Sequence, residues 1–388
     1  MRAGRARRRV GFMVNDKAVP PRYIHRPTPA ENAAEHNTWA YKVEIKSTSA
    51  TDLAGPLAGL TVIVKDNVNV GGVPSLLGTD VMSTPYVPAY DATVVTRLLL
   101  AGARLVGKVA CEHFSLAPNS FTNPHGNLQH PMALGYSAGG SSSGSRGSIR
   151  LPAAYCGIVG LKPTYGLVLV FEGSPRHWPR VVDKLDFCQT NGHITGPETT
   201  PLSGMQHALL LSAIAGKDGL DDRQNHAPAY GAVNYYESLL VYQHDPKVAV
   251  RGMRIAILRE SLQVGLDPRV AEKVKEAAHF FRASGVEVIE VSIPMHTLGG
   301  TISTMANRQG ISEQAMRGHV SLRPAVHDVA LNQELSKWTK HPGKIEQLQL
   351  HNPAATNALF VNKNAAERKA NSGWDDGYGV VFRLARGK

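Results

Sequence analysis

The most regular pattern of apolar and polar positions lies between residues 254 and 294, where RIAIL is followed by DPRVAEKVKEAAHFFRASG and VEVIEVSIP. The two outer runs are rich in β-branched residues and predict strands, whereas the middle run has helical spacing. Four apolar residues line one face of this helix: Val270, Val274, Ala277 and Phe281. Asp267 suits its N-cap, Pro268 its first position and Gly285 its end. Strand, helix and strand in this order predict a parallel pair with a right-handed crossover.

A similar unit is predicted nearer the N-terminus. LTVIVKDN (60–67) is a buried strand that brings Lys65 to the edge of a sheet or a cleft. In DATVVTRLLLAGARLVGKVAC (91–111), Asp91 suits an N-cap, an apolar helix ends at Gly102, and a strand follows. The two units together place the chain in the α/β class.

The remaining segments are less regular. Residues 10–58 are rich in proline, with a short helix expected around 30–41 and continuous order expected from residue 60. We therefore divide the chain into an N-terminal arm (1–50) with a basic tail and a single domain (51–388). Within that domain, 169–192 follows neither periodicity and is interpreted as an atypical insert.

Length and composition indicate a globular, intracellular protein. The chain has 388 residues, of which 43% are hydrophobic, enough for a large core. Its three cysteines have no paired spacing, so neither a disulfide framework nor a zinc site is predicted. The longest aliphatic run, ALLLSAIAG (208–216), suits a buried helix and is far shorter than a membrane span. We expect a cytoplasmic protein that has no contact with a membrane.

The formal net charge of +11 does not by itself indicate an acidic partner. Only the N-terminal MRAGRARRR is a basic run, and the other Lys and Arg residues are dispersed. The run lacks acidic residues, as a mitochondrial presequence does, but it also lacks serine and an amphipathic continuation. With 6% aromatic residues, the chain offers little of the basic and aromatic interleaving that binds nucleic acid. We expect no nucleic-acid partner.

The stretch GYSAGGSSSGSRGSIR (135–150) is the candidate for chemistry. A phosphate-binding loop requires lysine where Ser145 stands, and no dinucleotide fingerprint is present. A flexible linker is disfavoured because compact apolar sequence follows at 149–166.

A nucleophile elbow is a further alternative for this stretch. GSSSG (140–144) fits the G-x-S-x-G pattern, but the long strand that should precede it is missing. Three histidines could serve such a site: His113, His125 and His130. The stretch is best explained as the backbone of a different active site.

GGSSSGS, GSIRLPAAYCGIVGLKPTYG and the upstream VKDN together resemble the amidase signature family of amide hydrolases. The resemblance covers residues 20–166 and, more loosely, 194–260, and it is closest to bacterial and fungal amidases acting on nitrile-derived and aromatic amides. It implies a mixed, mostly parallel twisted sheet flanked by helices. It also implies hydrolysis of a carboxamide to a carboxylate and ammonia.

The resemblance implies a Ser, cis-Ser, Lys triad. Lys65 matches the general base, Ser141 the bridging serine after a cis peptide bond, and Ser148 the nucleophile. A neutral lysine amine can activate a serine hydroxyl if burial or nearby positive charge lowers the amine's pKa. The backbone of Ser145, Arg146 and Gly147 matches the oxyanion hole, where N–H groups stabilise the developing charge. Two glycines shape the loop before the bridging serine: Gly139 and Gly140.

The chain departs from the family pattern in three places. Ser141 and Ser148 are seven residues apart, where the family has a helix and a strand, and SRGSIR lacks the family's acidic residue and second glycine. An extended seven-residue span reaches at most about 25 Å, so the two serines can still meet. The segment 169–192 is substituted, and resemblance is expected to end near residue 300. These departures indicate an internally deleted, C-terminally shortened amidase with an incomplete fold.

The sequence thus predicts an amidase that acts on a small-molecule amide without a metal or organic cofactor. Two alternatives stay open: a catalytically impaired remnant or binding protein, and the glutaminase subunit of a tRNA-dependent amidotransferase. A homodimer is one option for its assembly.

Overall fold

The computed structural model describes residues 23–79, 85, 87–88, 91–112, 115, 120–124, 126–145, 150–164, 166–168, 204–218, 224, 226–262 and 266–299. Several predictions fall outside these residues: the basic tail, the insert at 169–192, the oxyanion residues Arg146 and Gly147, the nucleophile Ser148 and the segment after residue 300. The division into an arm and one domain therefore stays a prediction.

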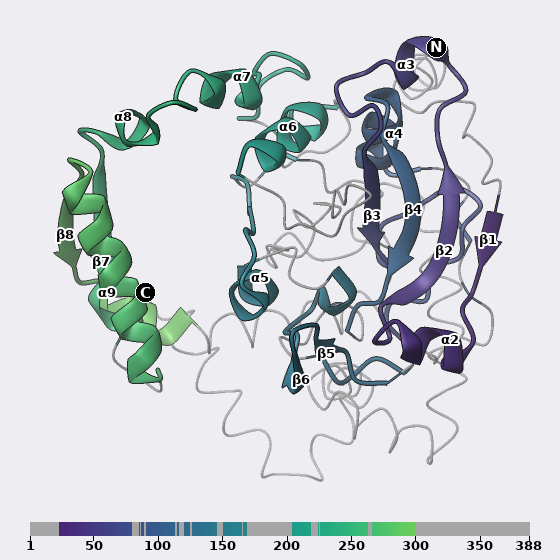
Figure 1. Cartoon of the computed structure of the whole chain (residues 1–388), viewed down its shortest axis with the longest axis horizontal. Coiled ribbons are helices and arrows are strands. Elements are labelled where there is room, and N and C mark those ends of the chain that lie inside the picture. Colours follow the sequence, from purple (N-terminus) through teal and green to yellow (C-terminus); the bar gives the residue numbers. More distant parts are fainter. Residues whose placement is uncertain are drawn as a thin grey trace, which may run out of the picture.

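Four strands form the main sheet: β1 (Tyr23–His25), β2 (Trp39–Ile45), β3 (Thr61–Lys65) and β4 (Arg104–Val109). Their order is β1-β2-β4-β3 (Figure 1). β3 and β4 are parallel and are connected through α4 (Thr93–Leu100), as the sequence predicts. The parallel pairing brings the carboxyl ends of β3 and β4 to the same edge of the sheet.

The start of α4 differs from the prediction. Its N-cap is Ala92, which makes no side-chain capping bond, and the carboxylate of Asp91 instead accepts the backbone N–H of Gly71 at 2.7 Å. Burial raises the pKa of Asp91 to about 6, and the bond from Gly71 opposes that rise. Asp91 therefore fixes a loop at the sheet edge instead of capping the helix.

The expectation that order begins at residue 60 is wrong. β1 and β2 pair antiparallel, and β2 also pairs antiparallel with β4, so β2 is an inner strand of the sheet. Among the described strands, antiparallel pairings outnumber parallel ones for this reason. The sheet is mixed, as predicted, but these N-terminal strands contribute more to it than the sequence indicated.

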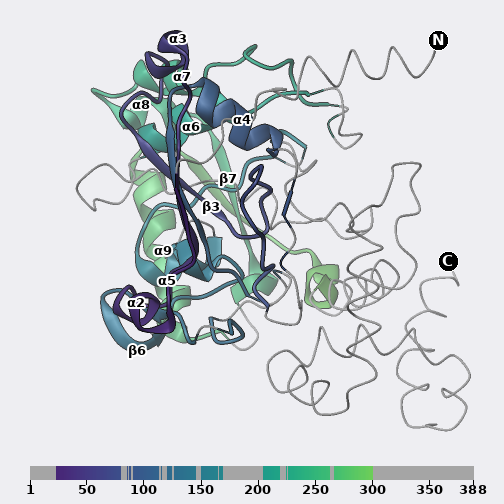
Figure 2. The same cartoon turned by 90° about the vertical axis from the view of Figure 1, so that its right-hand side faces the viewer.

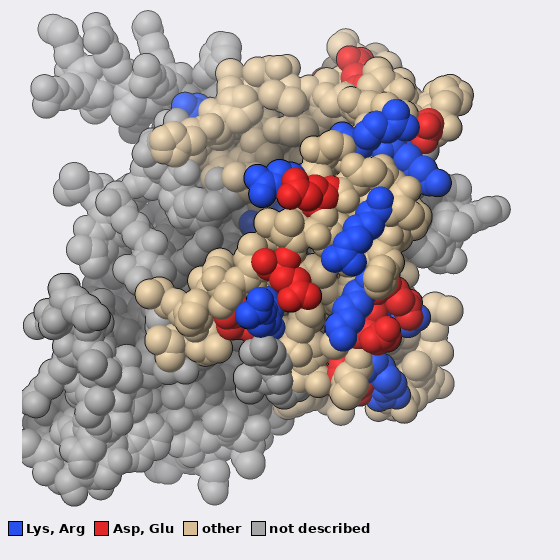
Figure 3. Space-filling model, turned by 90° about the vertical axis from the view of Figure 1, so that its left-hand side faces the viewer, with Lys and Arg blue, Asp and Glu red and all other residues tan. Residues whose placement is uncertain are grey.

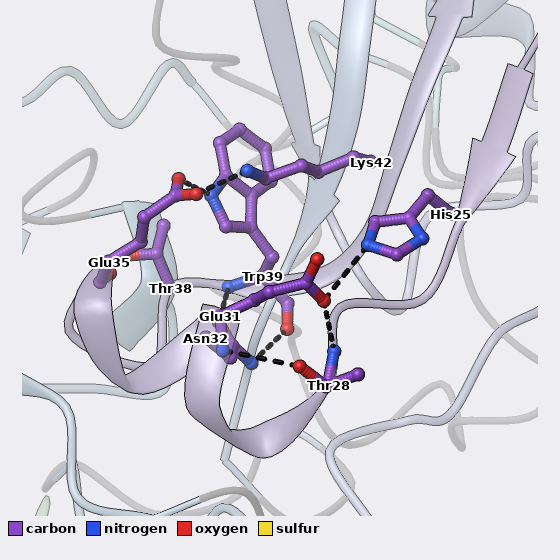
Figure 4. A network of polar contacts seen from close by, with 8 residues as sticks. All are labelled: His25, Thr28, Glu31, Asn32, Glu35, Thr38, Trp39 and Lys42. Atoms are coloured by element: carbon purple, nitrogen blue, oxygen red, sulfur yellow. Dashed lines mark hydrogen bonds and ion pairs between the residues drawn. The ribbon is translucent and has the colours of Figure 1, made fainter.

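A polar network joins α2 (Pro29–Ala34) to β2 (Figure 4). Thr28 and Glu31 form a capping box, in which Thr28 N–H donates to Glu31 Oε2 at 2.7 Å. The side chain of Asn32 bonds to both the N–H and the carbonyl of Trp39, at 3.0 and 2.8 Å. Helix α2 is therefore shorter than the predicted helix at 30–41 because the chain turns at its end and enters β2.

The main core lies between the sheet and two helices. α6 (Gly204–Ile214) lies beside α4 (Figures 1 and 2). Buried side chains from these elements form one cluster, which includes Val62, Val64, Leu98, Leu105, Leu210 and Ile214. The apolar run that the sequence assigned to a buried helix is thus part of α6 and packs in this core.

Arg97 connects α4 to the end of α6. Arg97 is 3% exposed, and its guanidinium donates to the carbonyls of Ile214, Gly216 and Lys217 at 2.7 to 3.0 Å. The guanidinium also stacks over the ring of Tyr230, 4.0 Å from its centroid. Burial lowers the pKa of Arg97 to about 10, against the effect of Tyr230 and Asp218. A cation at the C-terminal end of a helix also stabilises the helix dipole.

Substituting Arg97 with lysine is expected to reduce the free energy of unfolding by about 1 to 3 kcal/mol. A lysine ammonium lacks the planar fork that reaches three carbonyls at once, so buried acceptors lose their donors. Arg269→Lys is the matched control, because Arg269 is 90% exposed in its pair with Asp267 and exposed pairs contribute little. Urea denaturation measures the free energy of unfolding of both variants. Equal stability of Arg97→Lys and Arg269→Lys would contradict a role for the three carbonyl bonds.

The C-terminal unit consists of β7 (Arg254–Leu258), α9 (Pro268–Ala283) and β8 (Glu287–Val291). The strands pair in parallel, and Asp267 caps α9 by accepting the N–H of Arg269 at 2.8 Å, as predicted. The predicted apolar face is not buried, however, since Val270 and Val274 are 49% and 41% exposed and Ala278 is the buried residue of the helix. Figure 1 shows this unit on the far side of α5 (Arg150–Cys156) and α6 from the main sheet.

Short elements connect these parts: α3 (Ala50–Leu53), α7 (Tyr235–Leu240), α8 (Pro246–Val250) and the 3₁₀ turns Arg259–Leu262 and Pro294–Leu298. On the face that carries β7, α9 and β8, Lys and Arg alternate with Asp and Glu (Figure 3). Pairs such as Arg254 with Glu287, at 3.0 Å, account for this mixture. Among the described helices, none has the length and apolar character that crossing a membrane requires.

Candidate active site

Lys65 is the last residue of β3, where it lies opposite Val109 of β4. Its side chain is 1% exposed, and its Nζ donates to Ser141 Oγ at 2.9 Å. The carboxyl ends of parallel strands are the usual place for ligand sites in open α/β sheets. Lys65 and Ser141, 76 residues apart in the sequence, thus meet at such an edge.

Ser141 lies in the loop that follows the hairpin of β5 (Gln129–His130) and β6 (Ala133–Ser137). The peptide bond between Gly140 and Ser141 is cis, which agrees with the bridging serine that the family resemblance implies. Gly139 has a φ of +76°, a conformation that favours glycine. The loop ends in a 3₁₀ turn, Ser143–Ser145.

Close backbone packing holds this loop against the sheet. Gly144 N–H donates to the carbonyl of Ala110 at 3.0 Å, and Ala110 N–H in turn donates to the carbonyl of Thr38 at 2.8 Å. A Cβ at Gly144 would lie 2.6 Å from Thr38 O and from Ala110 N, so no larger residue fits without a shift. The N-terminal segment before β2 therefore supports the loop that carries Ser141.

Glu112 is buried beside the same loop. Its Oε1 accepts from Ser143 Oγ at 2.6 Å, and its Oε2 accepts from Thr122 N–H at 2.8 Å and from the Thr122 hydroxyl. Burial raises the pKa of Glu112, whereas these bonds and the charge of Lys65 act in the opposite direction. The carboxylate links the loop to the segment around Thr122.

Asp66, the residue after Lys65, forms a second buried charged group with Lys108. Their side chains are fully buried, with Lys108 Nζ 3.5 Å from Asp66 Oδ1. The carboxylate of Asp66 also accepts the N–H groups of Leu76 and Gly78, at 3.0 and 3.2 Å. Burial lowers the pKa of Lys108, and the charge of Asp66 opposes that shift. This pair fixes the backbone that follows β3, next to Lys65.

Cys111 carries a thiol, but its surroundings keep that thiol protonated and therefore a poor nucleophile. Its thiol is fully buried, and burial, together with the negative charge of Asp66, raises its pKa to about 12. A thiol is nucleophilic as its thiolate, which is scarce at neutral pH under these conditions. The serine loop is the better source of a nucleophile.

The structure brings together Lys65, Ser141, Gly139 and Gly140 of the predicted site. The backbone of Ser145 ends the 3₁₀ turn in the same loop, whereas the roles of Ser145, Arg146, Gly147 and Ser148 stay predictions.

The histidine alternative gains no support from His130. Its Nδ1 accepts Met132 N–H at 3.1 Å, which leaves the proton on Nε2 for the carbonyl of Tyr155 at 2.9 Å. The ring is thus bonded to backbone groups on both sides. Within the described ranges, no cluster of three or more His, Cys, Asp or Glu side chains is suited to a metal ion.

Sequence reasoning missed three buried charged residues at this site: Asp66, Lys108 and Glu112. Asp66 stands next to Lys65 in the quoted VKDN, and Lys108 and Glu112 lie in and just after a predicted strand. Charged residues are seldom fully buried unless they are paired, so a charge inside an apolar run was the available signal.

A family model described as Amidase matches residues 29–145 and 146–344. The chain belongs to the amidase family. The two matched pieces meet between Ser145 and Arg146, inside the seven-residue span that separates Ser141 from Ser148. The match extends to residue 344, so the expectation that the resemblance ends near residue 300 is wrong.

Two relatives show which amidase-family proteins this chain is similar to. An enantioselective amidase of Rhodococcus rhodochrous is 34% identical over 323 residues, covering 77% of this chain and 56% of the relative. A glutamyl-tRNA(Gln) amidotransferase subunit of Synechococcus sp. (strain CC9311) is 34% identical over 257 residues, covering 62% and 48%. The chain thus spans about half the length of these relatives.

Solved structures show the same amidase fold. Native peptide amidase from Stenotrophomonas maltophilia aligns with a TM-score of 0.53 and 26% identity, covering 78% of this chain and 64% of that one. The corresponding glutamyl-tRNA(Gln) amidotransferase subunit from Thermotoga maritima aligns with a TM-score of 0.55 and 22% identity, covering 82% and 65%. The predicted α/β fold with mixed sheets and flanking helices is confirmed.

Proposed function

We propose that this amidase-family chain hydrolyses a small-molecule carboxamide to a carboxylate and ammonia. The observation that carries the proposal is the buried 2.9 Å bond from Lys65 Nζ to Ser141 Oγ, at the carboxyl end of two parallel strands. A buried lysine bonded to a serine is a potential proton relay for a nucleophile, and Ser148 is the nucleophile we propose.

In the proposed reaction, Ser148 Oγ attacks the amide carbon while its proton passes to Ser141 Oγ and the Ser141 proton passes to the unprotonated amine of Lys65. Backbone N–H groups of 145–147 stabilise the oxyanion. The carbon–nitrogen bond then breaks, and the proton returns through Ser141 to the leaving nitrogen, which departs as ammonia. Water attacks the acyl ester by the same relay, releasing the carboxylate and regenerating Ser148.

The proposed chemistry needs neither a metal nor an organic cofactor, because the three side chains supply the nucleophile and the proton transfers. We propose that the protein acts in the cytoplasm, which agrees with cysteines that have no paired spacing in the sequence, and that a homodimer is a candidate assembly. The proposed partner is the amide substrate, with neither nucleic acid nor membrane involved.

Labelling with a fluorophosphonate tests the proposed nucleophile. Trypsin cuts after Arg146 and Arg150, so Ser148 is released in the tetrapeptide GSIR, whereas the loop serines fall in the separate peptide 109–146. We expect the label on GSIR and none on protein carrying Ser148→Ala. Label on the 109–146 peptide would move the nucleophile to that loop, and heat-denatured protein is the control for non-specific reaction.

Glutamine hydrolysis is the second candidate function. It is favoured by the 34% identity to an amidotransferase component, equal to the identity with the enantioselective amidase. Ammonia release from glutamine, benzamide and short aliphatic amides, measured side by side, separates the two candidates. Preference for glutamine would favour the amidotransferase role, and preference for benzamide would favour the amidase.

A further inference from the structure

We propose that Glu112 is a positioning residue for the Lys65–Ser141 relay, acting through the loop that carries Ser141. This inference rests on the proposed function, because it assigns a role in the same reaction. Glu112 bonds to neither reacting side chain through its carboxylate. Its carboxylate accepts from Ser143 and Thr122, and its backbone N–H bonds to the carbonyl of Ser141.

The first anchor is a backbone bond. Glu112 N–H donates to the carbonyl of Ser141 at 3.1 Å, which fixes the peptide unit directly after the bridging serine. The second anchor is the side chain, whose Oε1 accepts Ser143 Oγ at 2.6 Å. Two bonds from one residue thus hold the loop at positions 141 and 143. Rotation of the loop about its own axis would break at least one of them.

The anchor itself is held from two other sides. Glu112 Oε2 is bonded to the N–H and the hydroxyl of Thr122, so the carboxylate cannot swing away from the loop without losing those donors. At the backbone of Glu112, Gly78 packs so tightly that an added Cβ would lie 2.4 Å from the carbonyl oxygen. Contacts outside the loop therefore hold Glu112 in place, so that it can in turn hold the loop.

Burial argues that the carboxylate does more than fill space. Its side chain is fully buried, and an apolar residue of similar size avoids the cost of removing a charge from water. The donors around it compensate that cost and link the loop to Thr122 at the same time. Such a network orients a neighbouring catalytic group to a tolerance that packing alone does not provide.

The test measures the rate constant of fluorophosphonate inactivation separately from the inhibitor's binding constant. Glu112→Met removes the acceptors, and we expect the rate constant to fall about 10- to 100-fold, with the binding constant and the final labelled fraction unchanged. Glu112→Gln retains one acceptor and offers an N–H to the Ser143 hydroxyl, so it should restore the rate to within about tenfold of the parent chain.

Ser143→Ala is the second variant, and it keeps the test decisive if Glu112→Met does not fold. It removes the hydroxyl that links the loop to Glu112, and a fall in the rate constant of about 10-fold is expected. Arg97→Lys is the matched control, since it lowers stability by removing bonds to the end of α6 and should leave the rate constant unchanged. A structural role alone would lower the melting temperature or the labelled fraction in all variants, without lowering the rate constant.

The outcomes separate this inference from the proposed function. Label on Ser148 in the parent chain, together with parental rate constants in folded Glu112→Met and Ser143→Ala, overturns the inference and leaves the proposed function standing. A parent chain that does not label, or that labels equally as Ser148→Ala, overturns both.

Discussion

Replacing Lys65 with methionine is expected to lower the rate of acyl-enzyme formation on the order of 10³- to 10⁴-fold. Methionine has nearly the same length and fits an apolar site, but it cannot accept the proton that the relay delivers. General acid–base catalysis typically contributes about 10² to 10⁴ in rate, and loss of a member of a catalytic triad falls at or above the upper end. Ammonia release from an amide, and labelling of the GSIR peptide, measure the change.

Lys65→Arg is the matched control for charge. Arginine places a permanent positive charge at this position and does not lose its proton in proteins, so it offers no base. We expect it to be as inactive as Lys65→Met, with urea denaturation confirming that both variants fold. Activity retained in Lys65→Arg would show that the charge of Lys65 matters rather than its proton transfer.

Restoring a family-like segment between Ser145 and Gly147 is expected to raise amide hydrolysis about 100- to 1000-fold. We expect little activity from the unmodified chain, because the loss of one oxyanion donor typically costs roughly that factor. The two pieces of the family match meet at this point, and SRGSIR lacks a glycine and an acidic residue of the expected pattern. The restored helix and strand would hold the residues before Ser148 in place.

A flexible Gly/Ser segment of equal length, inserted at the same point, controls for added reach. It should leave ammonia release from benzamide near the level of the unmodified chain, because it lengthens the loop without supporting it. Equal activity in the unmodified and restored chains would contradict this prediction. It would also remove the reason for regarding the protein as an impaired remnant.

Local signals predicted the two parallel units correctly. The unit at 254–294 carries a cap at Asp267, a proline at the helix start and a glycine at its end, and all three features act within a few residues. The prediction that the apolar face of α9 is buried was wrong, because the exposure of a helix face depends on what packs against it. Periodicity places Val270 and Val274 on one side of α9 but says nothing of whether another element covers that side.

The strands β1 and β2 were missed because β2, the partner of β1, becomes an inner strand only through its pairing with β4, which is distant in sequence. β2 is WAYKVEI, and a lysine and a glutamate interrupt its apolar residues. What makes β2 an inner strand is its pairing with β4, which lies about 60 residues further along the chain. Lys65 and Ser141 were predicted from motifs, whereas the position of Glu112 depends on tertiary contacts to Thr122 and Ser143 that no local pattern records.

The strand order β1-β2-β4-β3 has a consequence for how the protein is made on the ribosome. One edge of β2 can pair with β1 at once, but its other edge waits for β4, which begins at Arg104. At roughly 5 to 20 residues per second, that wait is about 3 to 12 seconds. During this time an inner strand exposes unpaired backbone groups, which favour association with other chains. We therefore expect nascent chains of this protein to be most prone to association before β4, which ends at Val109, has emerged.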